Sequence, residues 1–117
     1  MKVVGSSSVA SEPAGPGADG VTIRWMLSDA DGAPNFALRV FEMEPGGHTP
    51  QHRHPWEHEV LVLAGAGSVS SASGEVSLRE GDAVLVEPDE PHQFSNPGSE
   101  VFRFACVVPN SAYGHGR

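Results

Sequence analysis

Three of the chain's histidines fall in one short segment, Pro50-Gln51-His52-Arg53-His54-Pro55-Trp56-Glu57-His58-Glu59. A fourth histidine, His92, follows the turn sequence Pro88-Asp89-Glu90-Pro91. Neutral imidazole nitrogen is the commonest protein ligand for first-row transition metals. On a short strand over residues 51–54, His52 and His54 would lie on one face, because side chains alternate along a strand. The spacing therefore predicts one metal ion held by His52, His54, His58 and His92.

Short strand-like runs separated by turn residues fill the chain on both sides of this segment. We expect strands at 21–27, 36–43, 51–54, 57–63, 68–71, 75–78, 83–86, 92–95 and 100–108, with breaks at turn sequences such as 44–47 and 96–98. No window of a dozen residues keeps a helical period without a glycine or proline. Many short strands at close spacing indicate an all-β sandwich or barrel, and 117 residues suffice for one such domain.

The two ends of the chain differ from its middle. Residues 1–20 are rich in Gly, Ser, Ala and Pro, which favours a flexible segment or an edge strand added to a partner. Residues 21–109 form the predicted barrel, and residues 110–117 form a polar tail. No apolar run approaches the ~20 residues of a membrane span, and residues 1–11 lack the apolar core of a secretory signal. We therefore expect a cytoplasmic protein.

The composition argues against several classes of function. The formal net charge of -8 argues against nucleic acid as a partner, because phosphate contacts need clusters of lysine and arginine. The single cysteine, Cys106, excludes an internal disulfide framework. Of the six histidines, His48 and His115 fit no ligand position of the predicted metal set. A small-molecule ligand or substrate is the partner that remains.

The spacing around the first three histidines resembles the first sequence motif of the cupin superfamily, G-x5-H-x-H-x3,4-E-x6-G. The matching positions are Gly46, His52, His54, His58 and Gly65. His58 then stands where the family usually has a glutamate. Glu59 is the alternative under the longer x4 spacing, but the final glycine of the motif, after six intervening residues, would then fall on Ala66. The resemblance therefore favours His58.

A later stretch resembles the second cupin motif, G-x5-P-x-G-x2-H-x3-N. Gly81, His92 and Asn96 match it, whereas Glu87 and Asp89 replace the proline and the second glycine. Over residues 36–108 the chain is most similar to small four-histidine manganese cupins, which carry the string His-Pro-Trp-Glu-His-Glu found here at 54–59. The resemblance implies a single double-stranded β-helix, or jelly-roll, barrel and a homodimer formed through the N-terminal strand. All-nitrogen ligation suits Mn, Fe, Co, Ni, Cu and Zn, and the resemblance favours Mn.

The alternation of side chains along the predicted strands indicates which residues form the wall of the metal pocket. Phe104 and Cys106 share one face of the run 100–108, and Phe94 shares the face of the fourth histidine. Cys106 is either a small buried apolar residue or an oxidisable thiol beside the metal. Arg39 is either an anion anchor inside the barrel or a solvated surface residue.

Four neutral ligands leave the charge of a divalent metal uncompensated, so the ion attracts anionic and enolate-like oxygen strongly. In a six-coordinate site they also leave two open positions, which suits bidentate substrate binding or adjacent binding of substrate and dioxygen. The resemblance implies an oxygenase-like enzyme that cleaves C=C or C–C bonds of a small hydrophobic or aromatic substrate. The alternatives are a Lewis-acid isomerase or lyase, and a non-catalytic module that binds a metal or a small ligand.

Overall fold

The computed structural model describes residues 1–112, so His115 lies outside the described residues. Nine strands and three short 3-10 helices follow one another in this part of the chain, and the predicted all-β fold is confirmed. The strands are β1 (Glu12–Pro13), β2 (Asp19–Leu27), β3 (Phe36–His48), β4 (His58–Ala64), β5 (Ala66–Ser71), β6 (Gly74–Arg79), β7 (Ala83–Val86), β8 (His92–Ser95) and β9 (Phe102–Pro109). The 3-10 helices are η1 (Ser6–Ser8), η2 (Asp29–Asp31) and η3 (Asn110–Ala112). No helix in the described range is long and apolar enough to cross a membrane.

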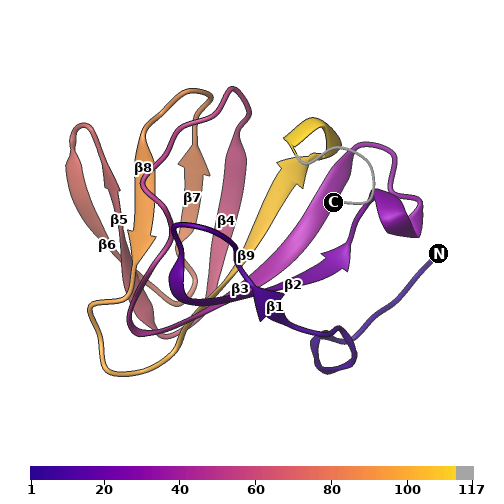
Figure 1. The fold of residues 1–117 in the computed structure, drawn as a ribbon, viewed down its shortest axis with the longest axis horizontal. Helices are drawn as coiled ribbons and strands as arrows, with labels where there is room; N and C mark the ends of the chain where they lie inside the picture. Colours follow the sequence, from indigo (N-terminus) through magenta and orange to yellow (C-terminus); the bar gives the residue numbers. More distant parts are fainter. Residues whose placement is uncertain (113–117) are drawn as a thin grey trace.

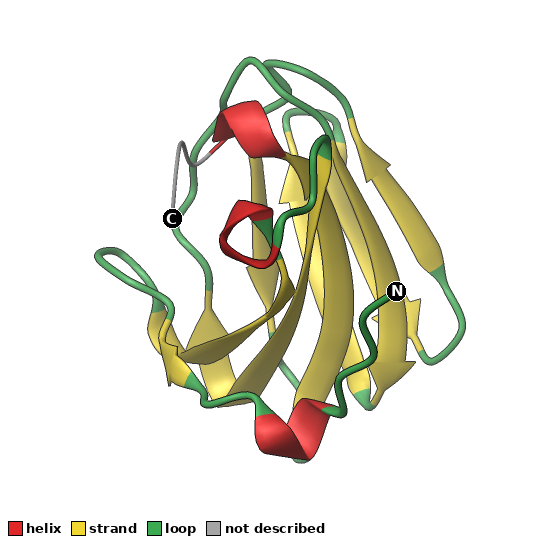
Figure 2. Cartoon of the chain, turned by 90° about the vertical axis from the view of Figure 1, so that its right-hand side faces the viewer, coloured by secondary structure: helices red, strands yellow, loops and turns green. Residues whose placement is uncertain are grey.

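The strands pair antiparallel and join into one curled sheet. Its order is β6-β5-β8-β3-β9-β4-β7, with β2 also paired to β3, and β1 paired to β2. Figures 1 and 2 show the sheet curling into a half-barrel, with β5, β6 and β8 on one side and β2 and β3 on the other. The long strand β3 connects the two sides, because it pairs with β2, β9 and, at its end, β8.

The predicted break at residues 44–47 is wrong, because β3 runs through it and ends at His48. Gly46 adopts a φ of +84° there, and its N–H donates to the Asn96 carbonyl oxygen at 2.9 Å. The Asn96 N–H in turn donates to the carbonyl oxygen of Gly47 at 3.0 Å. Glycine tolerates this left-handed backbone, so the turn-like residues bend the strand without ending it.

The predicted strand over residues 51–54 is also wrong. Only His52 pairs there, in an isolated antiparallel bridge with His92. Pro50 and Pro55 flank the stretch and have no N–H to donate to a ladder. The first two histidines therefore lie on a loop between β3 and β4, which is held to β8 by the His52–His92 bridge and by hydrogen bonds between Thr49 and Phe94.

Alternate residues of the central strands fill the interior of the half-barrel. Phe102, Phe104, Cys106 and Val108 of β9 are at most 3% exposed, as the alternation along that strand predicts. Met43, Val60, Val62, Val86 and Phe94 belong to the same buried cluster. Burial of a large apolar side chain stabilises a fold by roughly 1.5–3 kcal/mol. This packing holds the strands that carry the candidate site in place.

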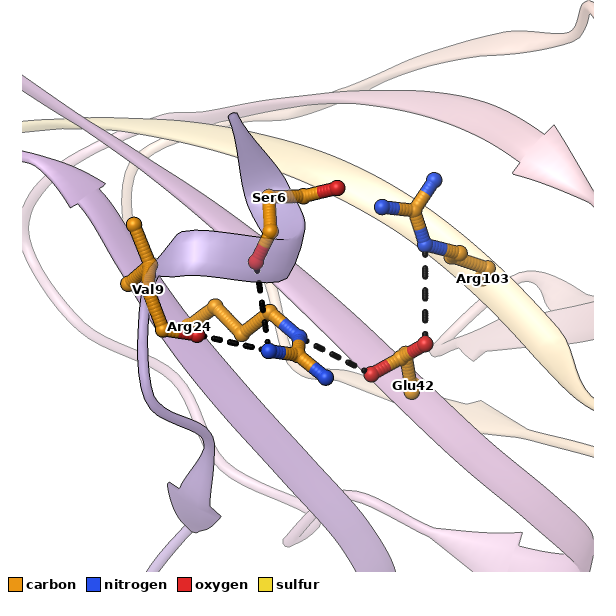
Figure 3. A network of polar contacts seen from close by, with 5 residues as sticks. All are labelled: Ser6, Val9, Arg24, Glu42 and Arg103. Carbon is orange, nitrogen blue, oxygen red and sulfur yellow. Dashed lines mark hydrogen bonds and ion pairs between the residues drawn. The ribbon is translucent and has the colours of Figure 1, made fainter. Parts of the chain in front are cut away.

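A polar network fixes the N-terminal segment to the sheet (Figure 3). Arg24 of β2 donates from Nη1 to the carbonyl oxygens of Ser6 and Val9, at 3.2 and 2.6 Å. Its Nε donates to Glu42 of β3 at 3.2 Å, and Arg103 of β9 forms an ion pair with the same carboxylate at 3.6 Å. The network leads the chain into β1, which lies along β2 as an edge strand.

Asn96 is buried and connects β3 to the loop between β8 and β9, so its loss should destabilise the fold. Its Nδ2 donates to the carbonyl oxygens of Met43 and Glu100 at 2.9 and 2.8 Å, and its Oδ1 accepts from Gly98 N–H at 3.0 Å. Asn96→Ala leaves these buried backbone groups without partners, so we expect the free energy of unfolding to fall by about 2–4 kcal/mol in urea titrations. The exposed control Ser99→Ala should change it by less than about 0.5 kcal/mol, and an equal effect of both substitutions contradicts this role.

Candidate metal centre

The structure brings four histidine rings together at one end of the half-barrel. Measured between ring centroids, His54 lies 4.3 Å from His58, 5.0 Å from His92 and 5.1 Å from His52. His52 lies 4.8 Å from His92. Reciprocal backbone hydrogen bonds between these last two residues, of 3.2 and 3.0 Å, hold the loop against β8. Residues that are 40 positions apart in the sequence thus become neighbours.

Backbone carbonyls orient two of these rings. The Nδ1 of His54 lies 3.0 Å from the Trp56 carbonyl oxygen, and the Nδ1 of His92 lies 2.8 Å from the Glu90 carbonyl oxygen. Because a carbonyl only accepts, each Nδ1 carries the proton and each Nε2 keeps a lone pair. The Trp56 ring also stacks on His54, with centroids 4.5 Å apart and planes 6° apart. One nitrogen from each of His52, His54 and His92 lies within 4.8 Å of the others, so these three residues can hold a metal ion.

His58 has different neighbours. Its Nδ1 lies 3.3 Å from Nη2 of Arg39 and 3.1 Å from Sγ of Cys106, and its Nε2 lies 2.5 Å from Nε2 of His54. The two neutral tautomers satisfy different subsets of these contacts. In one, Nδ1 accepts from Arg39 and Nε2–H donates to His54. In the other, Nδ1–H donates to Cys106 and Nε2 carries a lone pair, as a metal ligand requires.

Burial disfavours the charged form of three of the rings, those of His52, His54 and His58. Desolvation, followed by the nearby Arg39 guanidinium, lowers the pKa of His58 to about 2. Desolvation is also the largest cause that lowers the pKa of His52 and of His54 below 6.5. Burial raises the pKa of the Cys106 thiol, and Arg39 partly opposes that shift. Neutral imidazole is the form that binds a metal, so this part of the fold prepares ligands without a proton to displace.

Three of the four rings, those of His52, His58 and His92, line a cavity of about 270 Å³. Its lining residues come from β3, β4, β8, β9 and two loops: Ala14, Pro16, Ala18, Arg39, Phe41, Thr49, Pro50, His52, His58, Val60, His92, Phe94, Phe104 and Cys106. Phe104 is central to the apolar wall, because its ring stacks on Phe41 and on Phe94 with centroids 5.1 Å apart in both cases. The four pocket candidates from the sequence, Phe94, Phe104, Cys106 and Arg39, all lie in this lining.

Arg39 points into the cavity, although a solvated surface position was an open alternative. Its guanidinium carbon lies 5.4 Å from the Trp25 ring centroid and 5.0 Å from that of Phe41. Its Nη2 donates to Cys106 Sγ at 3.1 Å. Its Nε is buried and has no hydrogen-bond partner. The side chain is thus held by aromatic faces and not by a carboxylate.

Some residues near the motifs lie outside the histidine cluster, and some residues in or beside the cavity were not predicted from the sequence. Glu59, the alternative to His58, is exposed and lies on the opposite face of β4. His48 contacts the Thr49 carbonyl oxygen at 3.1 Å and does not line the cavity. Phe41 was missed, although its position two residues after Arg39 on one strand carries the signal. Trp25 was missed as well, and it reaches Arg39 only because β2 pairs with β3.

The comparisons with known proteins agree with this geometry. A family model described as a cupin domain matches residues 39–108. The crystal structure of the polyketide cyclase RemF from Streptomyces resistomycificus is 35% identical, covers 94% of this chain and 80% of that chain, and superposes with a TM-score of 0.89. The tetracenomycin polyketide synthase protein TcmJ from Streptomyces glaucescens is 28% identical over 101 residues, which is 82% of this chain and 68% of TcmJ.

A third relative has a different activity. The 1-methylthio-D-xylulose 5-phosphate methylsulfurylase of Rhodospirillum rubrum is 35% identical over 71 residues, which is 61% of this chain and 46% of that protein. The chain therefore spans less than half of this relative's length. Because the cupin-domain model covers more than half of the chain, and the curled antiparallel sheet is that of its structural neighbours, this chain belongs to the cupin family.

Proposed function

We propose that this chain is a metal-dependent cupin that catalyses a redox-neutral cyclisation of a small polyketone. The observation that carries the proposal is the convergence of four imidazole rings at one end of an aromatic-walled cavity. The similarity to RemF, which is a polyketide cyclase, and to TcmJ supports this substrate class.

In this proposal one divalent transition metal is held by His52, His54 and His92, with His58 as the fourth ligand. The first three residues already bring their ring nitrogens together. His58 joins them in the tautomer whose Nδ1–H donates to Cys106 Sγ, because its Nε2 then carries a lone pair. Nitrogen donors suit Mn, Fe, Co, Ni, Cu and Zn, and only the motif resemblance favours manganese.

The residues of the cavity prepare a substrate for such chemistry. A divalent ion with only neutral ligands would supply Lewis acidity toward a ketone or enolate oxygen. Phe41, Phe94 and Phe104 offer flat apolar surfaces on which a planar enol or aromatic ring packs. No carboxylate lines the cavity within the described chain, whereas Arg39 adds positive charge. The walls therefore stabilise an enolate relative to the neutral ketone.

The relatives do not support the oxygenase predicted from the motif resemblance. They are named for polyketide cyclisation, polyketide synthesis and a methylsulfurylase activity. A Lewis-acid isomerase or lyase is compatible with them. Dependence on dioxygen therefore separates the two enzymatic alternatives.

Anaerobic ring closure of a phenyl-capped linear triketone tests the proposed function. Attack of the terminal methyl carbon on the carbonyl beside the phenyl group, followed by loss of water, gives a phenyl-substituted resorcinol and needs no oxidant. We expect manganese- or zinc-loaded protein to accelerate product formation, followed by liquid chromatography and mass spectrometry, and metal-free protein to match the background rate. Turnover that consumes dioxygen supports the oxygenase instead, and no acceleration with any of the six metals supports a binding module.

Removal of two proposed ligands should abolish metal binding. In the double variant His52→Ala/His54→Ala, too few nitrogens remain to hold an ion, so we expect metal analysis after chelator-free purification to give less than about a tenth of an ion per chain. The matched control is His48→Ala, which removes a nearby histidine outside the cavity and should keep one ion per chain. One tightly held ion in the double variant contradicts the proposed ligand set.

The stability of the metal-free protein should fall with acidity. The folded-state pKa of His58, about 2, lies below the ordinary value of 6.5, so below pH 6.5 the unfolded chain binds a proton that the folded chain refuses. For this ring alone we expect a loss of about 1.5 kcal/mol in the free energy of unfolding between pH 6.5 and about pH 5, measured by urea titration with a chelator present. His58→Gln should show a shallower slope than His48→Gln, and equal slopes contradict the buried, uncharged state of His58.

A further inference from the structure

Arg39 is a cation without a carboxylate partner. The ion pairs of the described chain join Lys2 to Asp31, and Glu42 to two other arginines, and none includes Arg39. A guanidinium does not lose its proton in proteins. A charge that is partly removed from water costs free energy unless an opposite charge or hydrogen bonds compensate it. The cavity therefore contains a positive charge that its own walls do not balance.

The hydrogen bonds of this guanidinium are also incomplete. Its Nε is buried without a partner. Its Nη2 donates to the sulfur of Cys106, which is a weak acceptor, at 3.1 Å, and also lies 3.3 Å from the neutral Nδ1 of His58. Trp25 and Phe41 lie against the guanidinium, with ring centroids within 5.4 Å of its carbon. An anionic oxygen at the edge of the guanidinium would be a stronger acceptor than the thiol.

The rest of the cavity restricts the shape of the anion. Phe94 stacks with Phe104 at 5.1 Å and 25°, and Phe41 stacks with Phe104 at 5.1 Å and 15°, so the three rings form one apolar stack along the cavity, against which a planar ring can pack. The volume of about 270 Å³ lies just below the usual range for small-molecule pockets and suits a ligand of one or two rings.

We infer that the cavity selects planar organic anions and that Arg39 is the positioning residue which balances their charge. The ligand class is an aromatic or enolic ring that carries a carboxylate, phenolate or enolate oxygen. As a statement about substrates it rests on the proposed function, because it assigns the anion to the same cavity. Binding of the anion itself depends on Arg39 and the phenylalanine wall, so it can be measured without metal.

Calorimetric titration of the metal-free full-length protein with naphthoate and with naphthamide tests this inference. The two probes share shape and ring, and only naphthoate is charged at pH 7. We expect naphthoate to bind at least about tenfold more tightly than naphthamide, because only the anion compensates Arg39. This comparison uses the unaltered chain, so it does not depend on whether any variant folds. Equal affinity for the two probes, or no binding of naphthoate, overturns the inference.

Three variants connect the preference to Arg39. Arg39→Gln should abolish the preference for naphthoate, and Arg39→Lys should retain part of it, because lysine keeps the charge but not the planar fork. The control Arg53→Gln removes a positive charge from the exposed ligand loop, outside the cavity lining, and should change both affinities by less than about twofold. A naphthoate preference that survives in Arg39→Gln overturns the inference.

The two proposals can fail separately. Naphthoate selectivity through Arg39, without any ring closure of the triketone, leaves the inference standing and removes the proposed function. Ring closure by metal-loaded Arg39→Gln with an unchanged KM leaves the proposed function standing and overturns the inference, because removal of a substrate anchor must alter KM.

Discussion

Two backbone hydrogen bonds between His52 and His92 are the contact on which the candidate centre depends. The loop that carries His52 and His54 belongs to no strand ladder, and it is joined to β8 by this bridge and, nearer its start, by hydrogen bonds between Thr49 and Phe94. The bridge brings the two cupin motifs to one place, and the carbonyls of Trp56 and Glu90 then turn the rings inward. The metal-binding potential of the chain therefore rests on backbone geometry as much as on histidine chemistry.

The charge distribution inside the half-barrel follows from that geometry. Burial holds His58 uncharged, no acidic side chain lines the described cavity, and Arg39 supplies the positive charge there. In most proteins such an arginine would pair with a carboxylate. Its placement between aromatic rings and a thiol instead makes the cavity receptive to anionic oxygen. The same arrangement stabilises a deprotonated ketone, which connects the electrostatics to the proposed chemistry.

The cupin fold hosts many activities, so the family alone does not determine the reaction. The features of this chain that bear on its reaction are the three stacked phenylalanines, the half-buried Arg39 and the cluster of four histidine rings. The N-terminal segment contributes to the same site, because Ala14, Pro16 and Ala18 line the cavity after β1 has paired with β2. Arg24 and its contacts to Ser6 and Val9 therefore act indirectly on the shape of the pocket.

The sequence by itself determined most of the strands, except around residues 44–47 and 51–54, and the members of the histidine cluster. Alternation along β9 and the spacing of the two motifs are local patterns, and a pleated strand with a buried face enforces them directly. Only the tertiary structure decided that β3 continues past Gly46, because that depends on hydrogen bonds to Asn96, 50 positions away. It also decided that Arg39 faces inward and that His58 meets Arg39 and Cys106 instead of a carbonyl. These outcomes depend on strand register and on contacts between distant segments, for which no local pattern of residues carries information.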